Sequence, residues 1–396
     1  MTSMLRGSIG GNRRFSRMSA AGSRSMWAAI SLAIGSVIPI LGMPIMVEGL
    51  EDHWRLSASD AGYITAVDLA GTFIASSLTS ACAIRVHWRR YLTGSLLLAA
   101  LLNACCALHP APAVLAALRL GAGLTSGAAY ASSLTLLTRE PDTARAFSWM
   151  IFGQVVTNAA VLAVFPPIDD AYGPAGMFAA VGAVLLLTLA VMPLMPGRLP
   201  APDPVPSGSV TLLAGLCLGA IAFVYVAIGS YWAYAERMGV SIGISAPWVH
   251  RLLTGGVLLS GLGCFAAFWV SKRLGQSKPL LGALGALAAV LLIDSGWPTP
   301  LMYVLTLGTL QLCWNFIDIF QLGTLSAVDP TGRAAALVPA AQGVALALGP
   351  AAGAFMLSFG RGYPSVLAMA GVSAGFAVAC YALVHVLHGR GPPDAR

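Results

Sequence analysis

Long apolar runs separated by short polar segments dominate the pattern of this 396-residue chain. The runs hold about 20 residues each, and a helix of that length, rising about 1.5 Å per residue, crosses a hydrocarbon core of about 30 Å. Backbone groups inside a bilayer must be satisfied within the segment, which continuous apolar helices achieve. The pattern predicts twelve spans, at residues 26–49, 57–83, 91–108, 111–138, 146–165, 174–196, 210–235, 246–271, 279–294, 298–325, 334–358 and 364–387.

The composition supports a membrane protein and excludes an ordinary soluble domain. The chain is 57% hydrophobic and 9% charged, with a mean hydropathy of +0.80, whereas soluble domains carry about 25% charged residues. The net charge of +7 does not indicate nucleic-acid binding, because the basic residues are spread between apolar runs instead of forming one patch. We therefore predict no nucleic-acid partner, and we predict that the protein lies in a lipid bilayer.

The basic residues predict the topology. If the N-terminus is cytoplasmic, 17 of the 22 Lys and Arg fall in cytoplasmic segments, and only Arg55, Arg237 and Arg361 fall in outer ones. This asymmetry follows the positive-inside rule for an even number of helices. Eleven further runs follow the first, which is therefore expected to remain as an uncleaved helix. We expect a multi-pass protein of the bacterial inner (cytoplasmic) membrane with both termini in the cytoplasm.

The second half of the chain repeats the first at an offset of 188 residues, which places Glu48 on Glu236, Arg145 on Arg333 and Gln154 on Gln342. This offset carries span one onto span seven and preserves direction, so it predicts two parallel six-helix bundles related by an axis along the membrane normal. The expected domains are a basic tail at 1–25, bundles at 26–196 and 210–387, a proline-rich linker at 197–209 and a tail at 388–396.

Two short motifs carry a family resemblance. The segment between spans two and three ends in Arg89 and Arg90, and in span four Arg119 is followed by Gly123. With the six-plus-six repeat, these residues resemble the major facilitator superfamily over about residues 26–387. The resemblance implies an all-α membrane protein whose two pseudo-symmetric bundles rock around a central site, lined by spans one, four, seven and ten. The loop departs from the family pattern, with Arg85 where the family has an aspartate.

Polar residues recur at helical spacing inside spans two, four and ten, where they are expected to face protein or water instead of lipid. The repeat places Ser126 on Trp314 and Tyr130 on Asp318, so both halves use the same face. The alternative is that the small polar residues pack one helix against another. The candidate substrate-binding residues are Arg119, Ser126, Tyr130, Gln154, Asn158, Gln311, Trp314, Asn315, Arg251 and Gln342.

Charged residues within the spans are the strongest functional candidates. Each costs about 2.5–3.5 kcal/mol near a helix centre, so it must be paired, hydrated or neutralised. Asp68 and Asp318 are the predicted proton-coupling residues, and Arg119 is predicted to hold a substrate carboxylate or phosphate. A fixed Asp68–Arg119 ion pair is the alternative. For Arg251, with His250 beside it, the alternative is a side chain that reaches to the outer interface.

Candidate gating residues lie in span one and in two cytoplasmic loops. Pro39 interrupts the helical hydrogen bonds near the middle of span one and is expected to bend it. Asp142 with Arg145, and Asp329 with Arg333, form acid–base loops at equivalent positions of the two halves. The family resemblance implies that such loops close the inner face, and ordinary helix-end charges are the alternative.

The predicted function is secondary active transport of a small organic solute, an anion or zwitterion, by proton symport and alternating access. Proton-coupled efflux of amphipathic compounds is the first rival, although span five lacks the Gly-Pro element of drug–proton antiporters. A non-transporting sensor or a membrane enzyme is the rival of another class. The seven cysteines lack metal-ligand spacing and the chain has no phosphate loop. We predict no enzyme activity, cofactor or metal, and a monomer whose partners are the solute and protons.

Overall fold

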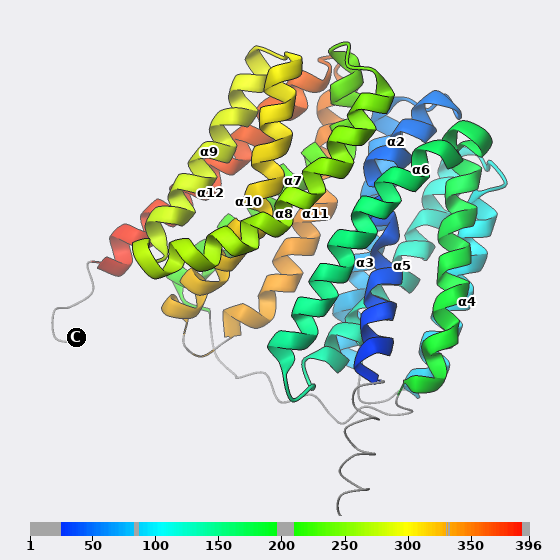
Figure 1. The fold of residues 1–396 in the computed structure, drawn as a ribbon, viewed down its shortest axis with the longest axis horizontal. Helices are drawn as coiled ribbons and strands as arrows, with labels where there is room; N and C mark the ends of the chain where they lie inside the picture. Colours follow the sequence, from blue (N-terminus) through cyan, green and yellow to red (C-terminus); the bar gives the residue numbers. More distant parts are fainter. Residues whose placement is uncertain (1–24, 83–86, 196–209, 330, 332, 390–396) are drawn as a thin grey trace, which may run out of the picture.

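The computed structural model describes residues 25–82, 87–195, 210–329, 331 and 333–389. The predicted linker at 197–209, nearly all of the basic tail, residues 390–396 and Arg85 lie outside this part of the chain. In it, the regular elements are helices (Figure 1): Ser25–Leu41, α2 Met43–Asp52, α3 Ala58–Cys82, α4 Trp88–Cys106, α5 Pro112–Leu137, α6 Thr143–Thr188, the 3-10 helix η1 Leu189–Leu194, α7 Leu212–Ser241, α8 Ala246–Leu274, α9 Ser277–Gly296, α10 Pro300–Val328, α11 Arg333–Ser358 and α12 Tyr363–Gly389.

These helices account for the twelve predicted spans. Nine of the described helices are long and apolar enough to cross a membrane, and the pair Ser25–Leu41 and α2, bent by 40°, makes a tenth. The 46 residues of α6 are too many for one span, and Gly173, with φ 63°, breaks α6 into two arms. The remaining span is α4, which has 19 residues.

The boundary between spans five and six differs from the sequence-based expectation. A loop was expected between residues 165 and 174, but the chain stays helical through Pro166 and Pro167 as far as the break at Gly173. Proline holds φ near the helical value, so it weakens a helix without ending it when neighbouring helices support the backbone. Gly173 ends the arm because its positive φ is open to glycine at little cost.

The two halves lie side by side. In Figure 1 the helices up to α6 form one group and α7 to α12 form the other. The start of the first helix and the last turn of α12 lie toward one end of the bundle, called here the terminal end (Figure 1). The α2–α3, α7–α8 and α11–α12 connections lie at the opposite end, called here the closed end for reasons given below.

Proline and capping residues set the helix starts. Pro112, Pro247 and Pro300 stand in the first turns of α5, α8 and α10, where the missing N–H would have no helical partner in any case. The Thr299 hydroxyl accepts a hydrogen bond from the Met302 N–H at 3.2 Å and so caps α10. These local signals explain why the polar gaps between apolar runs coincide with helix ends.

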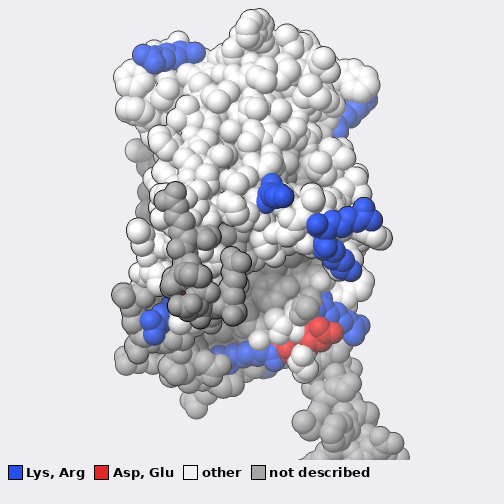
Figure 2. Space-filling view, turned by 90° about the vertical axis from the view of Figure 1, so that its left-hand side faces the viewer, with Lys and Arg blue, Asp and Glu red and all other residues white. Residues whose placement is uncertain are grey.

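The flank of the molecule shown in Figure 2 is mostly free of Lys, Arg, Asp and Glu. On α8, large apolar side chains are exposed over three successive turns: Leu258, Leu262, Phe265, Phe268 and Trp269. An apolar surface of this extent suits contact with lipid and would be unfavourable in water.

Helices α3 and α5 approach closely through glycines. A Cβ atom added at Gly123 would overlap the Asp68 carbonyl oxygen, and one added at Gly127 would overlap the Thr72 carbonyl oxygen. The Ser76 hydroxyl donates to the Gly127 carbonyl at 3.0 Å. The polar stripe of span two therefore lies against span four, so helix packing explains Thr72 and Ser76.

We predict that Gly127→Ala destabilises the protein by about 1–3 kcal/mol, because the added methyl forces α3 and α5 apart. The matched control is Gly94→Ala on the exposed face of α4, where an added Cβ meets nothing within 4 Å. That change should be neutral or slightly stabilising, since alanine favours helix by up to about 1 kcal/mol over glycine. Thermal unfolding in detergent measures both, and equal melting temperatures for the two variants would contradict the prediction.

Candidate functional site

Asp68 and Arg119 form an ion pair inside the first bundle. The Arg119 Nη2 atom of α5 lies 2.5 Å from the Asp68 Oδ2 atom of α3, and Arg119 Nη1 donates to Asn103 Oδ1 of α4 at 2.9 Å. The guanidinium also lies 5.2 Å from the ring centroid of Phe178 in α6. Arg119 is 3% exposed and Asp68 8% exposed. The pair thus ties four helices of one half together, and it leaves Arg119 occupied.

A second polar group spans the two halves. The Tyr225 hydroxyl of α7 donates to Asp318 Oδ2 of α10 at 2.8 Å. Tyr225 also lies beside Trp314 and near Tyr130 of α5, and Tyr130 lies beside Gln154 of α6. The second Asp318 oxygen, Oδ1, has no hydrogen-bond partner among the described residues. We call Tyr130, Gln154, Tyr225, Trp314 and Asp318 the central polar group.

Four other predicted substrate-binding residues are buried or half-buried in helices of the two halves. Asn315 Nδ2 donates to the Ser260 carbonyl of α8 at 3.3 Å. Ser126 and Gln311 are 4% and 2% exposed. Asn158 on α6 is half-buried, and its Oδ1 atom has no partner among the described residues. Asn315 thus joins α10 to α8, while Asn158 keeps an acceptor available.

The last two predicted substrate-binding residues are Gln342 and Arg251. Gln342 is half-buried on α11. Arg251 is exposed on the first turns of α8, and its guanidinium lies 5.0 Å from the centroid of the Trp248 ring. An exposed arginine in a cation–π contact near a helix end is what we expect of a side chain that reaches to the outer interface, the alternative stated above for Arg251.

Backbone-directed hydrogen bonds join the halves near the α2–α3 connection. Trp232 Nε1 of α7 donates to the Ile40 carbonyl at 3.0 Å, and the Tyr234 hydroxyl donates to the Ala58 carbonyl at 3.2 Å. From the other half, the Ser59 hydroxyl donates to the Ala354 carbonyl of α11 at 3.0 Å.

A charged cluster adjoins these contacts. Arg237 of α7 donates to both carboxylate oxygens of Asp52, at 2.8 and 3.1 Å, and its Nε atom pairs with Glu236. Glu48 of α2 accepts or donates a hydrogen bond with His250 Nε2 of α8 at 2.9 Å, depending on protonation. We call Glu48, Asp52, Glu236, Arg237 and His250 the closure cluster, because its members come from both halves. The polar contacts between halves that the described side chains make cluster at this end.

The predicted gating loops act as helix caps. Asp142 Oδ1 accepts from the Arg145 N–H at 3.0 Å at the start of α6. At the start of α11, Asp329 accepts from the Thr331 hydroxyl and from the Ala334 N–H at 2.7 Å. These hydrogen bonds, the Thr331 hydroxyl first, hold the pKa of the Asp329 carboxyl below its usual value.

No contact between the basic side chains and the capping aspartates of these loops is among the hydrogen bonds and ion pairs of the described residues. Arg145 is exposed, and the Nε atom of Arg333 has no hydrogen-bond partner among the described residues. Arg89 of the loop motif donates instead to the Pro193 carbonyl at 3.0 Å and the Met195 carbonyl at 2.7 Å, at the end of η1. These contacts stay within the first half.

The fifth predicted gating residue, Pro39, is buried one turn before the 40° bend between Ser25–Leu41 and α2. Gly42, at the bend, has the side chains of Phe165 and Val161 packed where a Cβ would stand. The bend is thus packed against α6, and the predicted flexing of span one at Pro39 stays a prediction.

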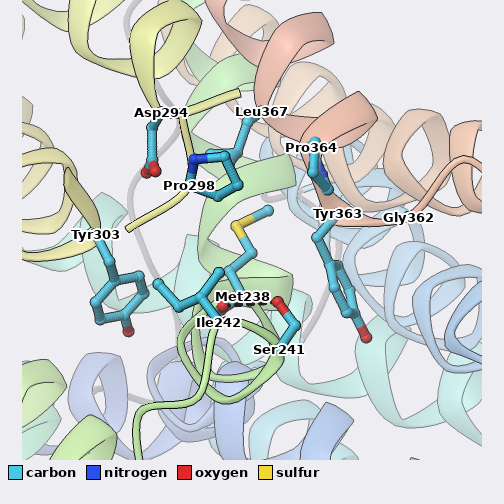
Figure 3. A pocket seen from close by; sticks show the side chains of 10 residues that line it. All are labelled: Met238, Ser241, Ile242, Asp294, Pro298, Tyr303, Gly362, Tyr363, Pro364 and Leu367. Carbon is cyan, nitrogen blue, oxygen red and sulfur yellow. Dashed lines mark hydrogen bonds between the residues drawn. The ribbon is translucent and has the colours of Figure 1, made fainter. Parts of the chain in front are cut away.

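A cavity of about 260 Å³ lies at the closed end of the second half. Figure 3 shows Asp294 and Tyr303 on one side of it and Tyr363 on the other. Its lining comes from α7, α9, α10, α12 and the segment before α10: Met238, Ser241, Ile242, Asp294, Pro298, Tyr303, Gly362, Tyr363, Pro364 and Leu367. None of these lining residues belongs to the central polar group, so the cavity is a separate place in the molecule.

No protein-family model and no curated protein sequence matches the chain. Solved structures match it over nearly its whole length. A D-xylose–proton symporter has a TM-score of 0.67 at 15% identity over 93% of this chain and 97% of its own. An auto-inhibited peptide transporter of the POT family has 0.70 at 12%, over 94% and 98%. A bacterial homologue of the human lysosomal transporter Spinster, inward-facing and unoccupied, has 0.70 at 15%, over 94% and 99%. The chain has the major facilitator fold.

This result confirms the predicted fold class and the resemblance stated from the motifs. The Asp68–Arg119 pair lies inside one bundle, whereas the central polar group contains residues of both, Tyr130 and Gln154 from the first and Tyr225, Trp314 and Asp318 from the second. The ion pair and the central polar group are therefore distinct places in the molecule.

Sequence reasoning missed several residues of these sites, among them Tyr225, Glu48 and Glu236. Tyr225 lies in an apolar stretch of span seven with no charged neighbour, so nothing marked it as a partner of Asp318. Glu48 and Glu236 carried a usable signal, because they are repeat-equivalent acids near span ends. Residues related by a two-fold pseudo-symmetry can meet each other only near its axis, and that geometry is not visible in one sequence.

Proposed function

We propose that the protein is a secondary active transporter that moves a small organic solute across a membrane by alternating access. One observation carries the proposal: polar contacts between the halves gather at the closed end, while the central polar group, with an unpartnered carboxylate oxygen, lies between the halves. An arrangement with one closed end and polar groups between the bundles is what a rocking mechanism requires.

We infer that the solute is a zwitterion, or another solute with a protonated amine. The central polar group contains one carboxylate, Asp318, and no positive charge, and Arg119 is paired with Asp68. A simple organic anion would therefore face Asp318 without a counter-charge. Of the two classes predicted from the sequence, a zwitterion finds a partner for its amine here, while Tyr130 and Gln154 offer hydrogen bonds to its other groups.

We propose proton symport as the coupling. Asp318 has one oxygen bonded to Tyr225 and one without a partner, so it can exchange a proton or a solute amine without breaking an ion pair. The structural neighbour described as a D-xylose–proton symporter supports this proposal. Asp68, the other predicted proton-coupling residue, would have to leave Arg119 first.

We place the terminal end in the cytoplasm of a bacterial inner membrane, as the distribution of Lys and Arg predicts. The conformation is then inward-facing, with the closure cluster on the outer side. The inward-facing state of the Spinster homologue, which has a TM-score of 0.70 to this chain, supports the assignment.

Transport in proteoliposomes with an imposed proton gradient tests the proposal. Labelled zwitterions, carboxylates and lipophilic cations are offered as separate panels. We expect zwitterions to accumulate with the inward proton flow and an uncoupler to abolish the accumulation. Exit of lipophilic cations against inward protons would favour efflux instead. If no panel member moves although solutes shift the melting temperature, a sensor would be the better explanation.

A further inference from the structure

In the closure cluster, the carboxylate oxygens of Glu48 and Glu236 have different partners. Arg237 takes one oxygen of each glutamate: its Nε pairs with Glu236 Oε2, and its Nη2 lies 3.5 Å from Glu48 Oε1. The other Glu48 oxygen, Oε2, lies 2.9 Å from His250 Nε2. Glu236 Oε1 has no partner among the described residues, although Glu236 is 0% exposed. A buried carboxylate oxygen without a partner carries a full desolvation cost, so it calls for a ligand.

We propose that Glu48, Glu236 and His250 form a binding site for a divalent transition-metal ion with the preferences of zinc. The ligand atoms that the three side chains offer lie within 4.8 Å of one another. One imidazole and two carboxylates are a donor set that zinc accepts, with bonds of about 2.0–2.2 Å and a fourth position open to water.

The distances are suited to such an ion after small movements. Two tetrahedral ligands at about 2.05 Å from zinc are about 3.3 Å apart. The separation of 2.9 Å between His250 Nε2 and Glu48 Oε2 therefore widens by a few tenths of an ångström. The ligand atoms of the three side chains, which lie within 4.8 Å of one another, then close on the ion by small side-chain rotations.

Charge also favours a divalent ion. Glu48, Asp52 and Glu236 gather around the single guanidinium of Arg237, so the cluster is acidic and attracts a cation. Arg237 pairs with Glu48 Oε1 and Glu236 Oε2, whereas His250 contacts Glu48 Oε2. Arg237 can therefore orient both carboxylates as outer-shell partners of metal sites do.

The ligands come from both halves, Glu48 from α2 and the other two from α7 and α8. A bound ion therefore holds the closed end together, and the halves separate there only after it leaves or loses a ligand. We expect zinc to slow transport by this means. That consequence rests on the proposed function, whereas the binding itself does not.

Calorimetric titration of the purified, tag-free protein in detergent with zinc chloride tests the site. We expect one saturable ion per chain in the micromolar range. His250→Gln keeps an amide to donate to Glu48 and removes the imidazole, so it should fold and bind zinc at least about tenfold more weakly. Glu236→Gln should weaken binding likewise. Each variant is first checked for an unchanged melting temperature without metal.

The control removes two exposed histidines one turn apart on α12, His385→Ala with His388→Ala, which should leave the affinity unchanged. The inference is overturned if no saturable binding occurs, if His250→Gln binds zinc as the wild type does, or if the α12 variant alone loses binding. Saturable zinc binding without any solute transport would overturn the proposed function and leave the metal site standing. Solute transport without saturable zinc binding would overturn the metal site and leave the proposed function standing.

Discussion

Arg119→Leu should lower the free energy of unfolding by about 3–5 kcal/mol, since it leaves the Asp68 carboxylate buried without its counter-charge. Asn103 and Phe178 also lose the guanidinium that they contact. The loss is measured by denaturant unfolding in detergent, followed by tryptophan fluorescence.

The double variant Asp68→Leu with Arg119→Leu is the control for this prediction. Replacing both members of a buried pair by apolar residues is often neutral, so the double variant should recover most of the lost stability. A transport role gives a different pattern. If Arg119→Lys kept the stability but sharply reduced the transport of anionic solutes, Arg119 would be a substrate-binding residue as predicted from the sequence.

Asp318→Asn should abolish gradient-driven accumulation and weaken solute binding by about 10- to 100-fold. A hydrogen bond to a charged group contributes about 1.5–3 kcal/mol, and every 1.4 kcal/mol is about tenfold in affinity. Binding is measured by calorimetry with the solute found in the panel, and coupling by uptake with and without the proton gradient. Tyr225→Phe, which removes the hydroxyl that donates a hydrogen bond to Asp318, should have a smaller effect in the same direction.

The matched control is Asp294→Asn, because Asp294 is also a buried acid of the second half, 3% exposed, but lines the separate cavity at the closed end. It should leave gradient dependence intact. Unchanged gradient dependence in Asp318→Asn would move the coupling role elsewhere, and Asp68→Asn would then be the next variant to examine.

The architecture was predictable because its signals are local or periodic. Apolar runs of spanning length predict helices whatever they pack against, and the match of Glu48 to Glu236 and of Arg145 to Arg333 predicts parallel halves. The kink at Gly173 was less visible, because Pro166 and Pro167 read as helix breakers while the helix continues through them.

The site was predictable only in part. Helical spacing correctly grouped Asp68 with Thr72 and Ser76 on one face, but spacing alone does not say whether that face meets another helix or the partner bundle. Gly123 and Gly127 decide the matter, because their missing side chains let α3 and α5 touch. The pairing of Tyr225 with Asp318 joins residues 93 positions apart through three-dimensional packing, which no periodicity encodes.

Helix α7 runs unbroken from Leu212 to Ser241, whereas the first helix, its repeat counterpart, is bent before α2. One rigid rod thus carries Tyr225 at the central polar group and Arg237 in the closure cluster, about 18 Å farther along its axis. A tilt imposed on α7 where solute binds displaces Arg237 at the far end, as a lever would. The two halves are alike in sequence register, yet α7 is one continuous helix between the central polar group and the closure cluster, where its counterpart is bent by 40°.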